Sequence, residues 1–189
     1  MSDSIRILAI SGSLRRQSLN TSLLRAAQLL ALPGIELDVA TLHGIPLYDG
    51  DMEEKEGIPP AVEALKSRIV ASDGLLLSTP EYNNGIPGVF KNAIDWLSRP
   101  PSDSGRVFAG RPVAVIGASP GGFGTILAQN AWLPVLRTLG MNHWAEGRLM
   151  ASRAHQAFDA AGELTDEKLR QQLGDFVQGY AAFITARRR

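Results

Sequence analysis

The clearest apolar pattern lies in the middle of the chain, between Gly74 and Arg99. Its first part, Gly74 to Thr79, is an apolar run without alternation, which is typical of a strand covered on both faces. A turn rich in proline, asparagine and glycine follows at 80–88. The apolar residues then recur at helical spacing as far as Leu97. The pattern predicts a buried strand, a rigid loop and a helix, in that order.

Similar patterns alternate along the rest of the chain. Apolar runs predict further strands at Ile5–Ile10, Ile35–Thr41 and Pro112–Ala118, and a weaker one within Asn142–Leu149. Helical spacing predicts helices from after Ser22 to near Pro33, over Pro59–Ser72, Thr125–Leu139 and Asp166–Arg187. Thr165 is the expected N-cap of the last helix. The stretches 42–58 and 100–111 are expected to be irregular connections.

Strands that alternate with helices indicate an α/β protein with right-handed crossovers and a parallel sheet. Five strands and about five helices fit a flavodoxin-like three-layer sandwich with strand order 2-1-3-4-5. We expect one domain over residues 1–189. In this topology the loops after the first, third and fourth strands meet at one crevice, where open α/β sheets bind ligands. These loops are residues 11–22, 80–88 and 119–125.

The composition excludes several classes of function. Nineteen basic residues balance nineteen acidic ones, so there is no basic surplus for nucleic acid. The chain has no cysteine, which removes disulfides, thiol nucleophiles and cysteine-ligated metal centres. The three histidines show no metal-ligand spacing, so no metal is predicted. No apolar run approaches the roughly 20 residues of a membrane span, and the polar start at 1–4 does not resemble a signal peptide. We expect a cytoplasmic protein without nucleic-acid or membrane partners.

The first loop has the groups that bind an anion. Its hydrogen-bonding side chains are Ser11, Ser13, Ser18, Asn20 and Thr21. Arg15 and Arg16 add positive charge, and the loop opens a helix whose free N–H groups attract phosphate. The loop is neither a Walker A sequence nor a dinucleotide-binding fingerprint. The alternative is a polar capping loop, with Asn20 as the N-cap and solvated arginines.

The other two loops are less specific on their own. The loop TPEYNNGIPG offers backbone groups that can lie along a planar heterocycle, and Gly85 is expected to supply a conformation closed to other residues. The loop ASPGGFGT has three glycines around Phe123. It can let a ring or a phosphate approach the backbone, or it can be a tight turn.

Taken together, three sequence motifs resemble the NADPH-dependent FMN reductases. They are GSLRRQSLN at 12–20, IPLYDGD at 45–51 and TPEYNNGIPGVFKNAIDWLSR at 79–99. The chain looks most like the quinone and chromate reductases, a branch that includes reductases of azo dyes. The resemblance implies noncovalent FMN in a flavodoxin-like fold, with NADPH or NADH as the hydride donor.

The resemblance also implies roles for individual residues. Ser11, Arg15, Ser18 and Asn20 would hold the phosphate, with Ser13 and Thr21 as additions. Pro80, Glu81, Tyr82 and Asn83 would line the flavin ring, and Ser119 and Gly122 would approach its other side. Many members of the family have an aromatic residue where this chain has Asn84. They commonly form homodimers or homotetramers, which makes Trp96 and its helix a candidate interface or, alternatively, part of the core.

The chemistry then belongs to the cofactor, and no catalytic side chain is predicted. We expect NAD(P)H to pass a hydride to FMN and a small-molecule electron acceptor, such as a quinone, chromate or an azo compound, to take its place in a ping-pong cycle. Two alternatives stay open from the residues. One is a flavodoxin-type electron carrier without NAD(P)H activity, which the zero net charge disfavours. The other is a flavin-free nucleotide or sugar-phosphate enzyme on the same fold.

Overall fold

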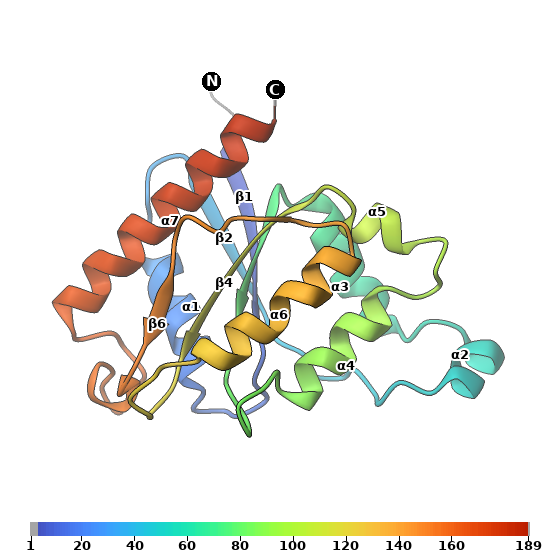
Figure 1. Cartoon of the computed structure of the whole chain (residues 1–189), viewed down its shortest axis with the longest axis horizontal. Helices are drawn as coiled ribbons and strands as arrows, with labels where there is room; N and C mark the ends of the chain where they lie inside the picture. The colour runs from blue at the N-terminus through green and yellow to red at the C-terminus, as the bar shows by residue number, and fades with distance from the viewer. Residues whose placement is uncertain (1–3, 189) are drawn as a thin grey trace.

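The computed structural model describes residues 4–188, and it contains a parallel sheet at its centre (Figure 1). Residues 1–3 and residue 189 lie outside the described residues. The expectation that the chain has no signal peptide rests partly on residues 1–3. The strands are β1 (Ile5–Ser11), β2 (Ile35–Ala40), β3 (Gly74–Ser78), β4 (Pro112–Ala118), β5 (Asn142–His143) and β6 (Leu149–Ala151). Their order is β2-β1-β3-β4-β5, and β6 also pairs with β4. The predicted flavodoxin-like order is confirmed.

Helices cover both faces of this sheet and complete the expected three layers (Figure 1). The helices are α1 (Leu19–Leu29), α2 (Gly50–Glu56), α3 (Pro60–Ala71), α4 (Gly88–Leu97), α5 (Ser104–Phe108), α6 (Ile126–Thr138), α7 (Glu167–Arg187) and the short η1 (Ala154–Gln156). Helices α1 and α7 pack on one face, whereas α3, α4, α5 and α6 pack on the other. None of the helices in residues 4–188 is long and apolar enough to cross a membrane. The expected cytoplasmic location stays a prediction.

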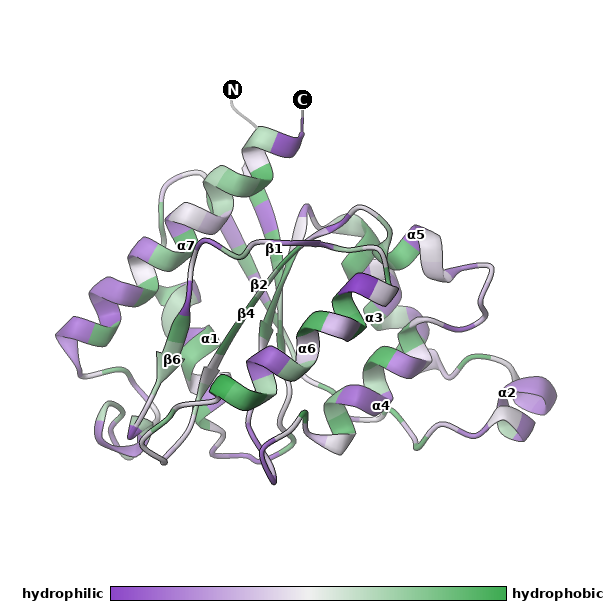
Figure 2. Cartoon of the chain, in the orientation of Figure 1, coloured by the Kyte–Doolittle hydropathy of each residue, from purple (hydrophilic) through white to green (hydrophobic). Residues whose placement is uncertain are grey.

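Strands β3 and β4 are apolar along almost their whole length because both of their faces are covered. In β3, Leu76 faces the core formed with α1 and α7, while Leu75 and Leu77 face the core formed with α3 to α6. Figure 2 shows these strands as almost continuously hydrophobic, whereas the helices are divided into apolar and polar faces. Tyr180 of α7 is fully buried and donates its hydroxyl to the Leu75 carbonyl at 2.8 Å. These contacts hold α7 against the sheet near the start of β3.

Two stretches that the sequence predicts to be irregular contain short helices. Helix α2 lies within 42–58 and buries none of its residues, so its sequence has no apolar period to detect. Asp49 caps it by accepting a hydrogen bond from the Asp51 N–H at 2.9 Å. Helix α5 lies within 100–111 and is only five residues long. Both predictions of irregular structure are therefore wrong over these segments.

The last third of the chain differs in two further details. The predicted fifth strand divides into β5 and β6, because residues 144–148 leave the sheet between them. The N-cap of α7 is Asp166, whose carboxylate accepts from the Leu169 N–H at 2.8 Å, so the expectation for Thr165 is wrong. Trp96 is fully buried in the core, which supports its core role over an interface role.

Candidate functional site

The three loops meet at the carboxyl ends of β1, β3 and β4, at the lower edge of the molecule in Figure 1. Between them lies an open pocket with a volume of about 80 Å³. It is lined by Ser13, Arg15, Ser18, Leu19, Asn20, Pro80, Glu81, Tyr82, Ala118, Ser119 and Pro120. The predicted residues Ser11, Thr21, Asn83 and Gly122 are not among its lining residues. The structure therefore brings together members of all three predicted loops.

Two glycines permit the strand ends to pack this closely. A Cβ atom on Gly12 would lie 2.1 Å from the ring of Phe90, the first large core residue of α4. A Cβ atom on Gly117 would lie 1.9 Å from the Thr125 hydroxyl and 2.4 Å from the Thr79 carbonyl. Real Cβ contacts do not reach such distances. A larger residue at Gly12 would push the first loop away from α4, and one at Gly117 would push the second and third loops away from β4.

Asn20 is a buried connection between the three loops. Its amide oxygen accepts from the Ala118 N–H and from the Ser78 hydroxyl, both at 3.0 Å. Its amide nitrogen donates to the Ala118 carbonyl at 2.9 Å. Ser11 and Thr21 likewise share a buried hydrogen bond of 2.8 Å between their hydroxyl groups. The side-chain groups of all three residues are thus engaged inside the protein, and their role as cofactor ligands stays a prediction.

The other side chains of the first loop are better placed to bind an anion. Ser18 is the N-cap of α1 and accepts from the Thr21 N–H at 3.2 Å, so the alternative with Asn20 as the cap is wrong. Ser13 accepts from the Arg15 N–H at 3.2 Å. Both hydroxyls act as acceptors in these bonds and keep their own hydrogens for a ligand. Arg15 and Arg16 are exposed, and neither forms an ion pair within residues 4–188.

The second loop is a two-residue β-hairpin. Tyr82 and Gly85 form an antiparallel bridge, with N–H to carbonyl distances of 3.3 and 3.1 Å. Asn83 and Asn84 between them have φ angles of 51° and 61°, the left-handed values of a type I′ turn. Gly85 has no positive φ, and a Cβ atom there would meet only the Tyr82 carbonyl at 3.9 Å. The expectation that this turn depends on Gly85 is therefore wrong, and Asn83 and Asn84 carry its unusual backbone.

Glu81 directs its carboxylate to the start of α6. One carboxylate oxygen accepts from the N–H groups of Leu127 at 2.9 Å and Ala128 at 3.0 Å. The third loop is held by the segment that follows β6: its Ser119 and Gly121 carbonyls accept N–H groups of residues 154 and 153 at 3.0 and 2.9 Å. No sequence signal marks this last contact, because only backbone groups take part.

Part of the longest family motif serves the scaffold rather than the crevice. On α4, Asn92 donates to the Pro46 carbonyl at 2.9 Å and accepts from the Tyr48 N–H at 2.8 Å. Trp96 donates to the same Pro46 carbonyl at 3.0 Å. The hydrogen bond from Arg99 lowers the pKa of Glu53 on α2. These contacts join the IPLYDGD segment to the KNAIDWLSR helix, a pairing that was not predicted.

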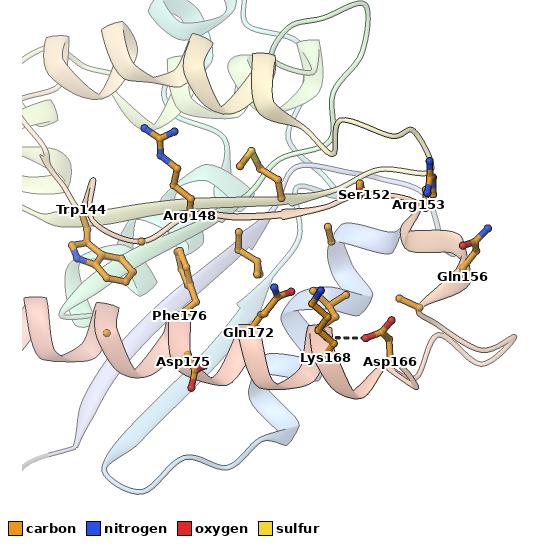
Figure 3. Close-up of a pocket in the computed structure, with 17 residues that line it drawn as sticks. Trp144, Arg148, Ser152, Arg153, Gln156, Asp166, Lys168, Gln172, Asp175 and Phe176 are labelled. Carbon is orange, nitrogen blue, oxygen red and sulfur yellow. Dashed lines mark hydrogen bonds between the residues drawn. The ribbon is translucent and has the colours of Figure 1, made fainter.

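A larger cleft lies elsewhere. It has a volume of about 820 Å³ and runs between β6 and α7 (Figure 3). Its charged residues, among them Arg148, Arg153 and Lys168, are exposed, and none of its lining residues is a predicted site residue. The described residues contain no group of three or more histidine, cysteine, aspartate or glutamate side chains that could hold a metal ion. The three-loop crevice is therefore the site that both sequence and geometry support.

Comparison with known proteins defines the class to which this fold and site belong. The NADPH-dependent FMN reductase family matches residues 5–156, and the chain belongs to that family. It is an oxidoreductase that works with FMN and NAD(P)H, as expected. Membership thus favours the reductase over the electron carrier and the flavin-free enzyme.

Individual proteins agree with this assignment. The chain is 44% identical to the NAD(P)H-dependent FMN reductase of Pseudomonas aeruginosa, over 97% of each chain. It is 38% identical to the 2-hydroxy-1,4-benzoquinone reductase of a Burkholderia species, over 97% of this chain and 98% of the relative. Among solved structures, the flavoenzyme FerB of Paracoccus denitrificans, an NAD(P)H:(acceptor) oxidoreductase, superimposes with a TM-score of 0.85 at 36% identity. That alignment covers 97% of this chain and 98% of FerB.

Proposed function

We propose that the three-loop crevice binds FMN noncovalently, with its phosphate against the first loop. Ser13, Ser18 and Arg15 supply hydroxyl donors and a positive charge, and the first turn of α1 supplies free N–H groups. The backbone of 80–83 would line the flavin ring, and Ser119 and Gly122 of the third loop would approach its other side. One convergence at a single sheet edge supports this proposal most. It joins Arg15, which forms no ion pair within residues 4–188, with two hydroxyls that keep hydrogens to donate and with the hairpin.

The first loop and the backbone of 80–83 would hold FMN, which would supply the two-electron hydride chemistry that links NAD(P)H to the acceptor. We propose a quinone as the acceptor, because the Burkholderia relative is named as a benzoquinone reductase. Chromate and azo compounds are further candidates. We expect donor and acceptor to occupy the same place beside the flavin in turn. This arrangement predicts ping-pong kinetics, and it requires no acid or base from the chain.

The function is tested by the flavin absorbance of protein reconstituted with FMN. Under anaerobic conditions, adding NADPH should bleach the band near 450 nm, and adding 1,4-benzoquinone should restore it. Steady-state rates measured against both substrates should give parallel double-reciprocal lines. Failure of NADPH and NADH to bleach the flavin would exclude the reductase. Intersecting lines would exclude the ping-pong cycle while leaving the reductase intact.

We also propose that a second copy of the chain covers the open side of the crevice. The pocket volume of about 80 Å³ admits a group of phosphate size. It is far less than the roughly 300–1,000 Å³ of pockets that bury a whole ligand. Large apolar side chains stand exposed beside it, namely Tyr82, Phe123, Ile126 and Leu127. Phe123 is 84% exposed. An apolar rim around a polar site favours a homodimer, or a homotetramer built from it.

This assembly is tested by light scattering on the purified protein. The wild type should have at least twice the mass of one chain. Phe123→Glu should shift the population towards single chains, because it places a charge in the proposed interface. Leu29→Glu is the matched control, since Leu29 of α1 is also an exposed apolar residue but lies outside the rim. Equal behaviour of the two variants would contradict the proposed interface.

A further inference from the structure

The start of α6 is capped by a residue from a different loop. The N-cap residue of α6, Thr125, makes no capping hydrogen bond with its side chain. Its hydroxyl is buried, accepts from the Gln129 side chain at 3.1 Å and fills the space beside Gly117. The N–H groups of Leu127 and Ala128 bond instead to one oxygen of Glu81, at 2.9 and 3.0 Å. The first turn of α6 is thus satisfied by the hairpin loop.

This contact restricts the hairpin as much as it caps the helix. A carboxylate at a helix N-terminus is favoured by the helix dipole, and its hydrogen bonds are charge-assisted. Glu81 directly precedes Tyr82, the first residue of the hairpin bridge, so its anchored side chain limits where the hairpin backbone can lie. Gly117 supports the same junction, because the close approach of Thr79 and Thr125 depends on its missing side chain.

We infer that Glu81 is a positioning residue, whose carboxylate anchors the 82–85 hairpin to α6 and does not itself bind the flavin. The inference rests on the proposed FMN site and revises the role that the family resemblance implies for the Glu81 side chain. The backbone of the hairpin lines the ring, and α6 holds that backbone in place. Flavin affinity then depends on a contact in which no flavin atom takes part.

The experiment compares three variants, each studied as apoprotein and with FMN. Glu81→Ala removes the anchor. Glu81→Gln keeps an oxygen that can accept the two N–H groups. Asp166→Ala is the matched control, because it removes a capping carboxylate from α7, away from the crevice. Hydrogen exchange of the apoprotein reports the anchor, and FMN titration by fluorescence quenching reports the site.

Glu81→Ala should accelerate amide exchange at Leu127 and Ala128 and also at Gly85, whose N–H closes the hairpin. It should weaken FMN binding about tenfold, the equivalent of about 1.4 kcal/mol. Glu81→Gln should bind FMN within about threefold of the wild type, which is less than 1 kcal/mol. Asp166→Ala should lower the melting temperature as Glu81→Ala does, yet bind FMN normally and leave Gly85 protected.

Two results would overturn the inference. If Glu81→Ala accelerates exchange only at the helix and leaves Gly85 and FMN affinity unchanged, the contact is a simple cap. If Glu81→Gln loses as much FMN affinity as Glu81→Ala without any change in exchange, the carboxylate acts on the flavin directly. A wild-type protein that does not bind FMN would refute the proposed function instead, and the exchange at Gly85 would still decide whether Glu81 anchors the hairpin.

Discussion

Replacing Asn20 by alanine separates a scaffold role from a ligand role in the first loop. The amide of Asn20 makes three hydrogen bonds, two to the backbone of Ala118 and one to the hydroxyl of Ser78, and the residue is 3% exposed. Truncation leaves three buried partners without their bonds, at about 1–3 kcal/mol each. Water that enters the vacated space restores part of this, so we expect a loss near the lower end, about 3 kcal/mol. For a chain of this length that is a fall in melting temperature of roughly 6–12 °C.

The assay is urea unfolding of the apoprotein, in which no cofactor contributes to stability. Asn20→Asp should destabilise to a similar extent, because it sets a carboxylate oxygen against the Ala118 carbonyl. Arg15→Ala should leave the unfolding free energy within about 0.5 kcal/mol, since Arg15 is an exposed surface residue. If Asn20→Ala costs the apoprotein less than about 1 kcal/mol but abolishes FMN binding, Asn20 is a ligand and the reasoning fails.

Three further predictions concern the scaffold. Asn84→Val should cost about 1–2 kcal/mol in urea unfolding, because it forces a β-branched residue into left-handed backbone. Gly85→Ala should be nearly neutral. The reverse ranking of the two variants would contradict the type I′ turn. Lys66→Met should cost about 2–3 kcal/mol in the same assay. This is below the ~3–5 kcal/mol of a fully buried ion pair, because the carboxylate partners of the buried Lys66 ammonium are partly exposed. No loss of stability would contradict a stabilising role for the contacts of Lys66. The hydrogen bond from Arg106 lowers the pKa of Asp103 to about 2, so its stabilisation is present above about pH 4 and lost as pH falls through about 2. Between about pH 4 and pH 2, the unfolding free energy of Asp103→Asn should fall less than that of the wild type. An equal pH dependence of the two proteins would refute the lowered pKa of Asp103.

The elements that the sequence predicts well are those whose period is set by burial. Strand β3 reads as continuously apolar because helices cover both of its faces, and α4 reads as helical because one of its faces packs on the sheet. The strand order then places three loops together, and the structure bears this out. Helix α2 has no buried residue, so its sequence has no apolar period from which a helix could be predicted.

The role of single side chains within the loops is much harder to predict. Asn20 and Glu81 are polar loop residues in family motifs, which suggested contact with the cofactor. Their partners, Ala118, Leu127 and Ala128, are backbone groups far away in the sequence, and no side-chain pattern records them. The sequence favours Gly85 as the residue that sets the hairpin conformation, because glycine adopts left-handed backbone more often than asparagine. In the structure Asn83 and Asn84 adopt it instead.

The most direct test of the account is the preference of the apoprotein for FMN over riboflavin, which differ only in the phosphate. Fluorescence quenching should show the wild type binding FMN far more tightly than riboflavin. In Arg15→Ala the affinity for FMN should fall by about 1.5–3 kcal/mol while that for riboflavin changes little. Equal binding of the two flavins by the wild type, or an undiminished preference in Arg15→Ala, would contradict a phosphate site in the first loop.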